Sequence, residues 1–343
     1  MWYSVNDTLA INLLTYNFLP SWWRGNYGLT FGKKIVFDPD YRVELHRFMT
    51  RTVNERFPGL HIGSKDAPAQ VVLPDFGNAI TAAAAGCEVM YSEDNYPWNQ
   101  HLPMEKVSSL RVPSDLRNVF PYSEISQQVA YLNRKLGTDS PVTWNSRGVL
   151  NDAALIGGPA FLEEFGADTP NARHLLAYSN GMLTTVIRAN HDLFHYQDMV
   201  MLTNCTIMMV SPSTYEKRLR HYDLAVEQLV TSQDQRLGIH HCGSFEKYAH
   251  IYQKIPDLLW LEIGWGSDFR LALDLFPQTF VQYILSAVFV STATRMEVRQ
   301  KITEILEIAR GAWHRFRMTM PDVDAGTPDE NLYEIYDVCK KAR

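Results

Sequence analysis

The sequence predicts an α/β fold, a (β/α)8 TIM barrel with an N-terminal extension, and three observations lead to this prediction. From about residue 68 onward, short apolar runs alternate with segments in which apolar residues recur at helical spacing. About eight such runs share about 270 residues, a length typical of this barrel. The chain of 343 residues is 46% hydrophobic and 20% charged, so it can bury a large core.

The expected strands are short apolar runs, and helical segments separate them. In chain order the strands are Val71–Leu73, Glu88–Tyr91, Val142–Asn145, Met199–Leu202 with a continuation at Ile207–Val210, Leu237–Cys242, Leu258–Ile263, Phe280–Leu285 and Arg315–Met318. The helices are Tyr122–Lys135, Ala160–Glu164, Asn171–His191, Pro212–Leu229, Phe245–Lys254, Phe269–Leu275 and Met296–His314. The last helix is the clearest, because Val298, Ile302 and Ile305 share one face.

Residues 1–67 lack this alternation. They are rich in aromatic residues and contain the helix breakers Pro20, Gly25 and Gly28. One helix is expected, from Tyr41 to about Phe57, because the sequence Asp-Pro-Asp at 38–40 is a typical helix start. We therefore expect residues 1–67 to form an extension that packs on a barrel of residues 68–343.

Composition argues against several classes of protein. The net charge is −6 and no run of Lys or Arg is present, so nucleic-acid binding is not expected. The longest uncharged stretches contain proline and polar residues, so we expect no membrane span. The four cysteines are far apart and form no CxxC pair, which predicts a reduced, cytoplasmic protein without a disulfide scaffold. The N-terminus lacks the features of a secretory signal.

The segment Gly-Ile-His-His-Cys-Gly at 238–243 is the sharpest local signal. Because side chains alternate along a strand, His240 and Cys242 point the same way and His241 points to the other side. They lie at the carboxyl end of a strand, where barrel enzymes place their active sites. An imidazole and a thiolate at this spacing can bind one zinc ion. A buried cysteine beside a hydrogen-bonded histidine is the alternative interpretation.

Glu262 lies in the next apolar strand. A lone buried carboxylate is costly, so the residue must be paired, protonated or bound to a metal. It is a candidate catalytic residue and a candidate metal ligand, and the alternative is a salt bridge at the barrel rim.

Other candidates lie at strand ends and in one aromatic loop. Asp198 and Asn204 flank the strand at 199–202 and are candidate catalytic residues. The candidate substrate-binding residues are Trp144, Asn145, Arg147, Trp260 and Tyr96. Of these, Arg147 either binds an anion or lies in a solvated loop, and the aromatic residues are as typical of a core as of a pocket.

Several motifs together resemble the uroporphyrinogen decarboxylase superfamily, in its corrinoid-dependent methyltransferase branch. They are Ser-Pro-Ser-Thr-Tyr at 211–215, His-His-Cys-Gly at 240–243, Gly-Val-Leu at 148–150 followed by Gly157-Gly158, the helix at 294–308, and Gly-Thr-Pro-Asp-Glu-Asn at 326–331. The resemblance covers about residues 68–343.

This resemblance implies a (β/α)8 barrel in which His240 and Cys242 bind zinc. It also implies that a methyl group moves between a small molecule and the cobalt of a cobalamin-type corrinoid, which a partner protein carries. Zinc acts there as a Lewis acid that activates the substrate or the methyl acceptor.

The sequence departs from the family at three places. The N-terminal arginine motif of the decarboxylases is absent, so porphyrinogen decarboxylation is not expected. The Gly-Asn-x-Asp sequence after the seventh strand is also missing. The further cysteine of the methyltransferases is missing from 318–324, so the third zinc ligand is Glu262, Asp322 or Asp324, or no zinc binds.

Two functional hypotheses follow. The first is a zinc-assisted, corrinoid-dependent methyltransferase of the demethylase type, with a small methylated substrate such as a methoxy-aromatic compound and a corrinoid-binding protein as partner. The second is a metal-free, decarboxylase-like lyase or a small-molecule-binding barrel. The sequence leaves a homodimer open, and fold analogy alone does not identify the methyl donor.

Overall fold

Six parallel strands form the centre of the protein. The computed structural model describes residues 2–4, 14–142, 144, 147–193 and 199–342. Its main sheet has seven strands in the order β1-β2-β9-β8-β7-β6-β5, and all neighbours are parallel except the antiparallel pair β1–β2. The strands of this sheet are β1 (Trp2–Ser4), β2 (Leu14–Phe18), β5 (Met199–Thr203), β6 (Arg236–His241), β7 (Trp260–Ile263), β8 (Phe280–Ile284) and β9 (Phe316–Val323).

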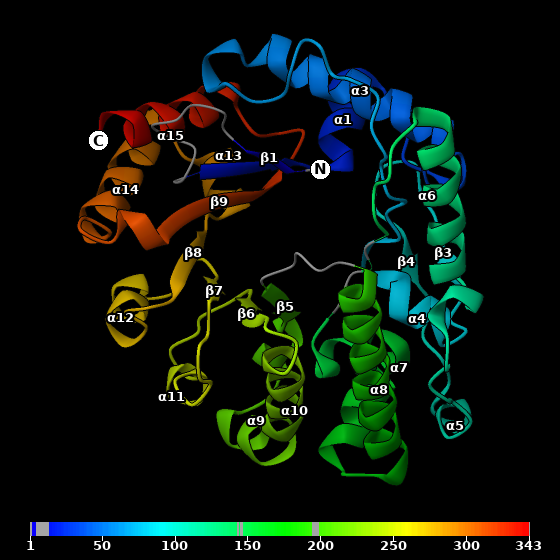
Figure 1. The fold of residues 1–343 in the computed structure, drawn as a ribbon. Helices are drawn as coiled ribbons and strands as arrows, with labels where there is room; N and C mark the ends of the chain where they lie inside the picture. The colour runs from blue at the N-terminus through cyan, green and yellow to red at the C-terminus, as the bar shows by residue number, and fades with distance from the viewer. Residues whose placement is uncertain (1, 5–13, 143, 145–146, 194–198, 343) are drawn as a thin grey trace.

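The expected α/β fold with a parallel sheet is confirmed, and the sheet curls as half of a barrel. Among the described residues it stays open, with β1 and β5 at its edges. Figure 1 shows α4, α6 and a small sheet of β3 (Val89–Met90) and β4 (Trp98–Asn99) on the side of the molecule opposite β8 and β9. The helices α7 and α8, which precede β5 in the chain, lie between these elements and β5. Helices and loops there occupy the positions that the sequence assigned to the first barrel strands.

Helices lie around the outside of the sheet and on the side of the molecule opposite β8 and β9. They are α1 (Pro20–Tyr27), α2 (Lys33–Phe37), α3 (Pro39–Arg56), α4 (Ile80–Ala84), α5 (Met104–Val107), α6 (Tyr122–Leu136), α7 (Val149–Gly166), α8 (Pro170–Leu193), α9 (Pro212–Arg218), α10 (Arg220–Thr231), α11 (Ala249–Tyr252), α12 (Phe269–Leu275), α13 (Ala287–Thr292), α14 (Arg295–Ile308) and α15 (Asp329–Lys341). Every expected helix has a counterpart, although the segments expected at 245–254 and 296–314 are helical over shorter spans. Within the described part of the chain, no helix combines the length and the hydropathy that a bilayer span requires.

Four of the expected strands differ in the structure. Val71–Leu73 belongs to no sheet, and Glu88–Tyr91 contributes only β3, which pairs with β4. The continuation expected at Ile207–Val210 is mostly a 3-10 helix at Cys205–Met209. Val142–Asn145 lies partly outside the described residues, and its described positions, 142 and 144, are in no strand. Short apolar runs do not distinguish a paired strand from an irregular segment that packs on the core.

The N-terminal region contributes β2 to the sheet, which the sequence did not predict. All five residues of β2 are buried, so the strand lacks the alternation of a half-exposed strand. Its polar groups find partners in β9: the Thr15 hydroxyl donates to Thr319 Oγ1 at 2.8 Å, and the Asn17 amide donates to the Pro321 carbonyl at 2.8 Å. The described part of the N-terminal region therefore contributes β1 and β2 to the sheet, and the boundary at 67/68 stays a prediction.

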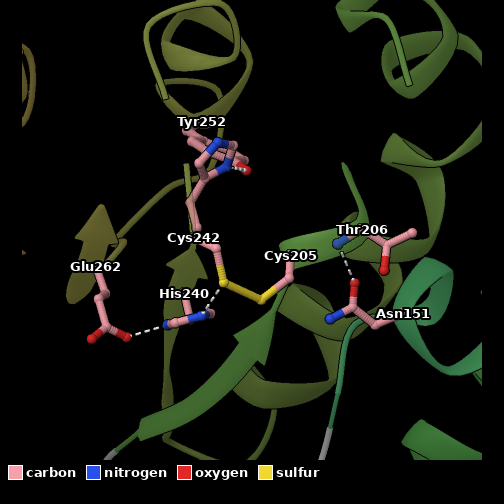
Figure 2. The surroundings of a disulfide bond; sticks show 8 residues. Asn151, Cys205, Thr206, His240, Cys242, Tyr252 and Glu262 are labelled. Atoms are coloured by element: carbon pink, nitrogen blue, oxygen red, sulfur yellow. Dashed lines mark hydrogen bonds and ion pairs between the residues drawn. A yellow bond between two sulfur atoms is a disulfide. The ribbon is translucent and has the colours of Figure 1, made fainter. Parts of the chain in front are cut away.

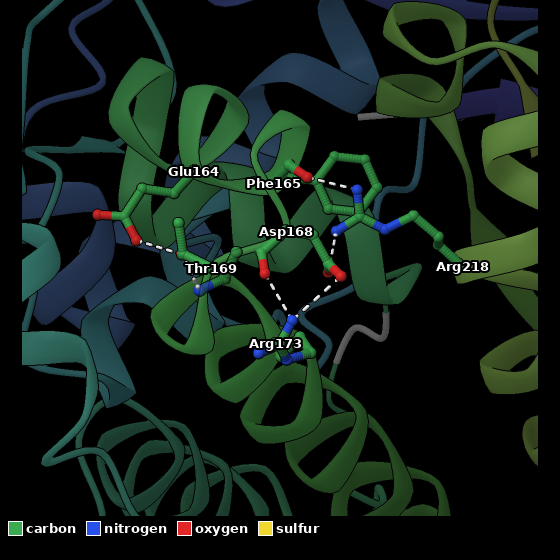
Figure 3. A network of polar contacts seen from close by, with 7 residues as sticks. Glu164, Phe165, Asp168, Thr169, Arg173 and Arg218 are labelled. Atoms are coloured by element: carbon green, nitrogen blue, oxygen red, sulfur yellow. Dashed lines mark hydrogen bonds and ion pairs between the residues drawn. The ribbon is translucent and has the colours of Figure 1, made fainter.

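The Ser-Pro motif starts a short helix, as expected. The Ser211 hydroxyl accepts a hydrogen bond from the Thr214 N–H at 3.1 Å and caps α9, whose first turn contains Pro212. At the other end of α9, Arg218 binds Asp168 at 2.7 Å and stacks over the ring of Phe165 at 4.1 Å (Figure 3). These contacts join α9 to the turn between α7 and α8.

A buried carboxylate joins α14 to α15. The side chain of Glu334 on α15 has no exposed surface, and both Arg295 and Arg299 of α14 form ion pairs with it. The hydrogen bonds from Arg299 and Arg295 lower the pKa of Glu334. The two guanidinium groups remain half exposed, so the desolvation cost of each is smaller than that of a fully buried cation.

We predict that Glu334→Gln lowers the free energy of unfolding by about 1–3 kcal/mol, because two charged partners lose their acceptor. The carboxylate has a lowered pKa in the folded state, so its contribution is present above the unfolded pKa near 4.3 and is lost as the pH falls through the folded value. Urea unfolding at neutral and acidic pH measures both effects.

The matched control is Glu304→Gln on the partner helix α14, where an exposed pair with Lys301 at 3.5 Å should contribute less than about 0.5 kcal/mol. Equal unfolding midpoints for the wild type and Glu334→Gln at neutral pH would contradict the assignment.

Candidate functional site

A row of polar side chains crosses four neighbouring strands. The parallel register places His240 of β6 beside Glu262 of β7, Glu262 beside Gln282 of β8, and Gln282 beside Arg317 of β9. Arg317 Nε donates to Gln282 Oε1 at 2.7 Å, and Gln282 Nε2 donates to Glu262 Oε1. The second carboxylate oxygen of Glu262 binds His240 Nδ1. The buried carboxylate of Glu262 is therefore paired at both oxygens, as its position in an apolar strand required.

This row fixes the orientation of the His240 ring. An ionised Glu262 only accepts hydrogen bonds, so Nδ1 of His240 carries the proton and Nε2 keeps its lone pair. Nε2 faces Cys242 Sγ at 2.8 Å. At the other end of the row, Arg317 stacks over Trp260 at 4.7 Å, and burial lowers its pKa.

Two cysteines meet His240 at the carboxyl edge of the sheet. Cys242 directly follows β6, and Cys205 follows β5 by two residues. The ligand atoms of Cys205, His240 and Cys242 all lie within 4.8 Å of one another (Figure 2). The Cα atoms of the two cysteines are 5.2 Å apart, and the structure pairs their sulfurs as a disulfide. This pair departs from the prediction that the cysteines stay unpaired.

The three side chains fit a zinc ion in the reduced state. Two thiolates and one imidazole are a usual zinc donor set, and three protein ligands leave one position for a substrate. His240 offers Nε2 toward the sulfurs while Glu262 holds Nδ1, which is the arrangement seen around histidine ligands of zinc. The site is also partly exposed, since Cys242 reaches the surface and Cys205 and His240 are half-buried.

The structure brings His240, Cys242 and Glu262 together, as expected, but the group of three side chains that could hold a metal does not include Glu262. Glu262 binds the ring nitrogen of His240 that faces away from Cys242, so it lies behind the histidine. Asp322 and Asp324 lie outside the three-residue group, and Asp324 accepts hydrogen bonds from Ser21 and Ala325. Cys205 takes the third position. The sequence feature that could have identified Cys205 is its position shortly after the expected strand at 199–202.

A second polar network lies beneath the cysteines and holds Asn204. The Asn204 amide donates to Asp223 at 3.3 Å, and the Tyr215 hydroxyl of the Ser-Pro-x-x-Tyr motif donates to the same carboxylate. Burial raises the pKa of Asp223 to about 6. Asn204 is therefore buried, and its side-chain amide takes part in this network next to Cys205. The catalytic role that the sequence suggested for Asn204 stays a prediction.

His241 belongs to the core on the opposite side of β6, as its place in the strand predicted. Its Nδ1 contacts the Tyr252 hydroxyl at 2.8 Å, and its Nε2 contacts the Ser244 carbonyl at 3.2 Å. Burial lowers the pKa of His241 to about 4, so the ring is neutral near pH 7.

The segment that leads into α7 is attached to the end of β5. The Gly148 N–H donates to the Thr203 carbonyl at 3.0 Å, and the Thr206 N–H donates to Asn151 Oδ1 at 2.7 Å. A Cβ atom at position 148 would lie 2.0 Å from Asn204 Oδ1, so this close approach requires glycine. The contact places Arg147 beside the strand end that carries Cys205.

The remaining candidate residues separate into three groups. Arg147 and Tyr96 line one cavity of about 680 Å³. Trp144 and Trp260 lie outside that lining: Trp144 packs on Tyr122 with ring centroids 5.3 Å apart, and Trp260 stacks on Phe280 at 4.3 Å. Asn145 and Asp198 fall outside the described residues, so their roles stay predictions.

No protein-family model and no curated protein matches the chain. Among solved structures, the chain is similar to a methyltransferase from Methanosarcina mazei, with a TM-score of 0.65 and 14% sequence identity over 95% of this chain and 91% of that chain. A psychrophilic glycoside hydrolase family 10 endo-beta-1,4-xylanase matches with a TM-score of 0.41 and 9% identity over 64% of this chain and 83% of that chain. The first likeness shows a shared fold.

We predict that protein purified without reductant or metal carries a Cys205–Cys242 disulfide, while Cys87 and Cys339 remain free thiols. Both free cysteines are buried, and burial raises the pKa of Cys87 to about 11, so it should react with thiol reagents only after unfolding. Non-reducing peptide mapping identifies the linkage. A disulfide that involves Cys87 or Cys339, or four free thiols, would contradict the structure.

Proposed function

We propose that this protein is a zinc-dependent methyltransferase that moves a methyl group between a small methylated molecule and the cobalt of a corrinoid carried by a partner protein. The observation that carries the proposal is the group of Cys205, His240 and Cys242 at the carboxyl edge of the curled parallel sheet. The fold shared with the Methanosarcina mazei protein supports it, because that protein is a methyltransferase.

Each residue of the centre has a separate task in this proposal. Cys205 and Cys242 supply thiolates, and His240 supplies Nε2. Zinc in such a site supplies Lewis acidity, which lowers the pKa of a bound thiol or polarises an ether oxygen. Glu262 is a positioning residue: it keeps the proton on Nδ1 of His240 and so leaves Nε2 directed toward the sulfur atoms.

The proposal also concerns substrate and partner. The cavity that Arg147 and Tyr96 line includes Trp98 and Pro97, and these flat surfaces suit a methoxy-aromatic substrate of the demethylase type. The half-exposed sulfur centre leaves room for a corrinoid presented by another protein. Because the described chain uses its carboxyl edge for the metal ligands, the corrinoid protein should dock over that edge.

A second candidate function has one specific observation in its favour. The pairing of Cys205 with Cys242 would remove both thiolates from a metal centre. A metal-free lyase or a small-molecule-binding protein would keep that bond permanently, whereas the zinc centre requires that it be reduced.

We predict about one zinc per chain in protein purified with reductant, measured by elemental analysis. Cys205→Ala and Cys242→Ala should lose most of the metal, because two protein ligands bind zinc weakly. Glu262→Gln should keep the site but weaken zinc affinity by roughly 10–100-fold, because it alters only the support of His240. The matched control is Cys87→Ala, which removes a buried thiol outside the centre.

Activity is tested by mixing the zinc-loaded protein with reduced cobalamin and methoxy-aromatic compounds, and by following the absorption spectrum of the corrinoid. A spectrum that shifts to that of a methylated corrinoid, and does so faster than with Cys205→Ala, supports methyl transfer. If the protein binds zinc but the corrinoid spectrum does not change, the proposed reaction is wrong and the metal centre still stands. Absence of zinc in the reduced wild type would favour the metal-free candidate.

A further inference from the structure

The cavity that Arg147 and Tyr96 line has further polar residues, none of which belongs to the candidate metal centre. Its volume is about 680 Å³, and its polar residues include Asn17, Asp75, Asn78, His101 and Arg147. Asn17 is the fourth residue of β2, so the cavity lies at the carboxyl edge of the sheet, as the sulfur centre does. Arg147 immediately precedes Gly148, which is hydrogen-bonded to the end of β5 two residues before Cys205.

The guanidinium group of Arg147 is anchored by a hydrogen bond to the protein. Nη2 donates to the Gly77 carbonyl at 3.1 Å, which anchors the group at one corner. Nε is buried and has no hydrogen-bond partner among the described residues. No ion pair of Arg147 within 4 Å is seen in the described part of the chain. Because Nε has almost no exposed surface, a ligand in the cavity can reach Arg147 only through its terminal Nη nitrogens.

Asp152 lies behind Arg147 and does not neutralise it fully. It is completely buried at the start of α7, and its Oδ1 has no partner among the described residues. Burial raises the pKa of Asp152 to about 7, although the charge of Arg147 acts in the opposite direction. Near neutral pH this carboxyl group is protonated in a large fraction of molecules, so the cavity keeps much of the positive charge of Arg147.

The far wall of the cavity is formed at a kink in α7. Gly158 adopts φ +61°, and a Cβ atom there would lie 2.4 Å from Cδ2 of His101. The kink therefore makes space for the His101 ring, whose Nδ1 contacts the Leu155 carbonyl at 3.0 Å. Both the positive φ and the close approach of His101 require glycine at position 158, so a larger residue there would displace the His101 ring that lines the cavity.

One carboxylate in the lining limits where an anion can bind. Asp75 is exposed to the cavity, and its Oδ1 accepts a hydrogen bond from the Gly77 N–H at 2.7 Å. Its negative charge disfavours an anion at that end. Asp75 also lies close to Arg147, because both residues are hydrogen-bonded to Gly77 and the charge of Asp75 acts on the guanidinium. An anion must therefore approach Arg147 from the side away from Asp75.

We infer that Arg147 is the binding site for an oxyanion group of the substrate, and that the substrate is therefore a small anionic molecule. The planar guanidinium matches a carboxylate or a phosphate group, which it can bind through two N–H donors. The identity of the reaction at the other end of the substrate rests on the proposed function. The anion site itself rests on Arg147 and its cavity.

The test uses the metal-free, reduced protein and three small probes: propionate, inorganic phosphate and the neutral propionamide. We expect saturable binding of an anion by isothermal titration calorimetry, and the better of the two anions distinguishes a carboxylate from a phosphate ligand. Propionamide should not bind. Arg147→Met should weaken anion binding by about tenfold or more, which corresponds to about 1.4 kcal/mol or more. Asp75→Asn should strengthen it, because a like charge is removed.

Arg147→Lys guards against a folding defect, because it keeps the charge and loses the planar fork. We expect binding between that of the wild type and that of Arg147→Met. The matched control is Arg173→Met, an exposed arginine that pairs with Asp168 at 3.1 Å far from the cavity (Figure 3). It should bind anions as the wild type does.

The inference is overturned if neither anion binds the wild type saturably, if Arg147→Met binds as tightly as the wild type, or if propionamide binds equally well. The zinc and methyl-transfer experiments are read separately. Anion binding without methyl transfer would keep the Arg147 site and overturn the proposed reaction. Methyl transfer without anion binding would overturn the Arg147 site and support the proposed reaction.

Discussion

His240 is held by a chain of hydrogen bonds that crosses four parallel strands. The register of β6 to β9 aligns His240, Glu262, Gln282 and Arg317, and each side chain forms a hydrogen bond with the next one in the row. A buried carboxylate at Glu262 would otherwise carry a large desolvation cost. Because the chain ends on Nδ1 of His240, Nε2 is left facing the sulfur atom of Cys242. The candidate metal centre depends on the hydrogen bond between Glu262 and Nδ1 of His240, which leaves Nε2 available on the other side of the ring.

The sulfur atoms and the cavity are brought to the same edge by the direction of the strands. In a curled parallel sheet all strands end on one side, so the residues after β5, after β6 and near the end of β2 converge there. The close contact of Gly148 with Asn204, and the bonds from Asn204 and Tyr215 to Asp223, fix the segment around Cys205 from below.

The sequence predicted the strands whose apolar runs are separated by clear helices, and these became β5 to β9. Alternation along one strand also placed His240 and Cys242 on the same side and His241 in the core. The sequence did not predict β2, since burial on both faces removes alternation. It did not predict that Cys205 lies beside Cys242 either, because the two residues are 37 positions apart and no local spacing connects them. Such a contact depends on strand register, which is set by tertiary packing.

The central claim is that Cys205, His240 and Cys242 together hold zinc. X-ray absorption spectroscopy at the zinc edge of the reduced, zinc-loaded protein tests it most directly, because the spectrum counts sulfur and light-atom neighbours. We expect two sulfur neighbours and at least one imidazole nitrogen, and Cys205→Ala should leave only one sulfur. A first shell of nitrogen and oxygen alone, or one that Cys205→Ala leaves unchanged, would contradict the account.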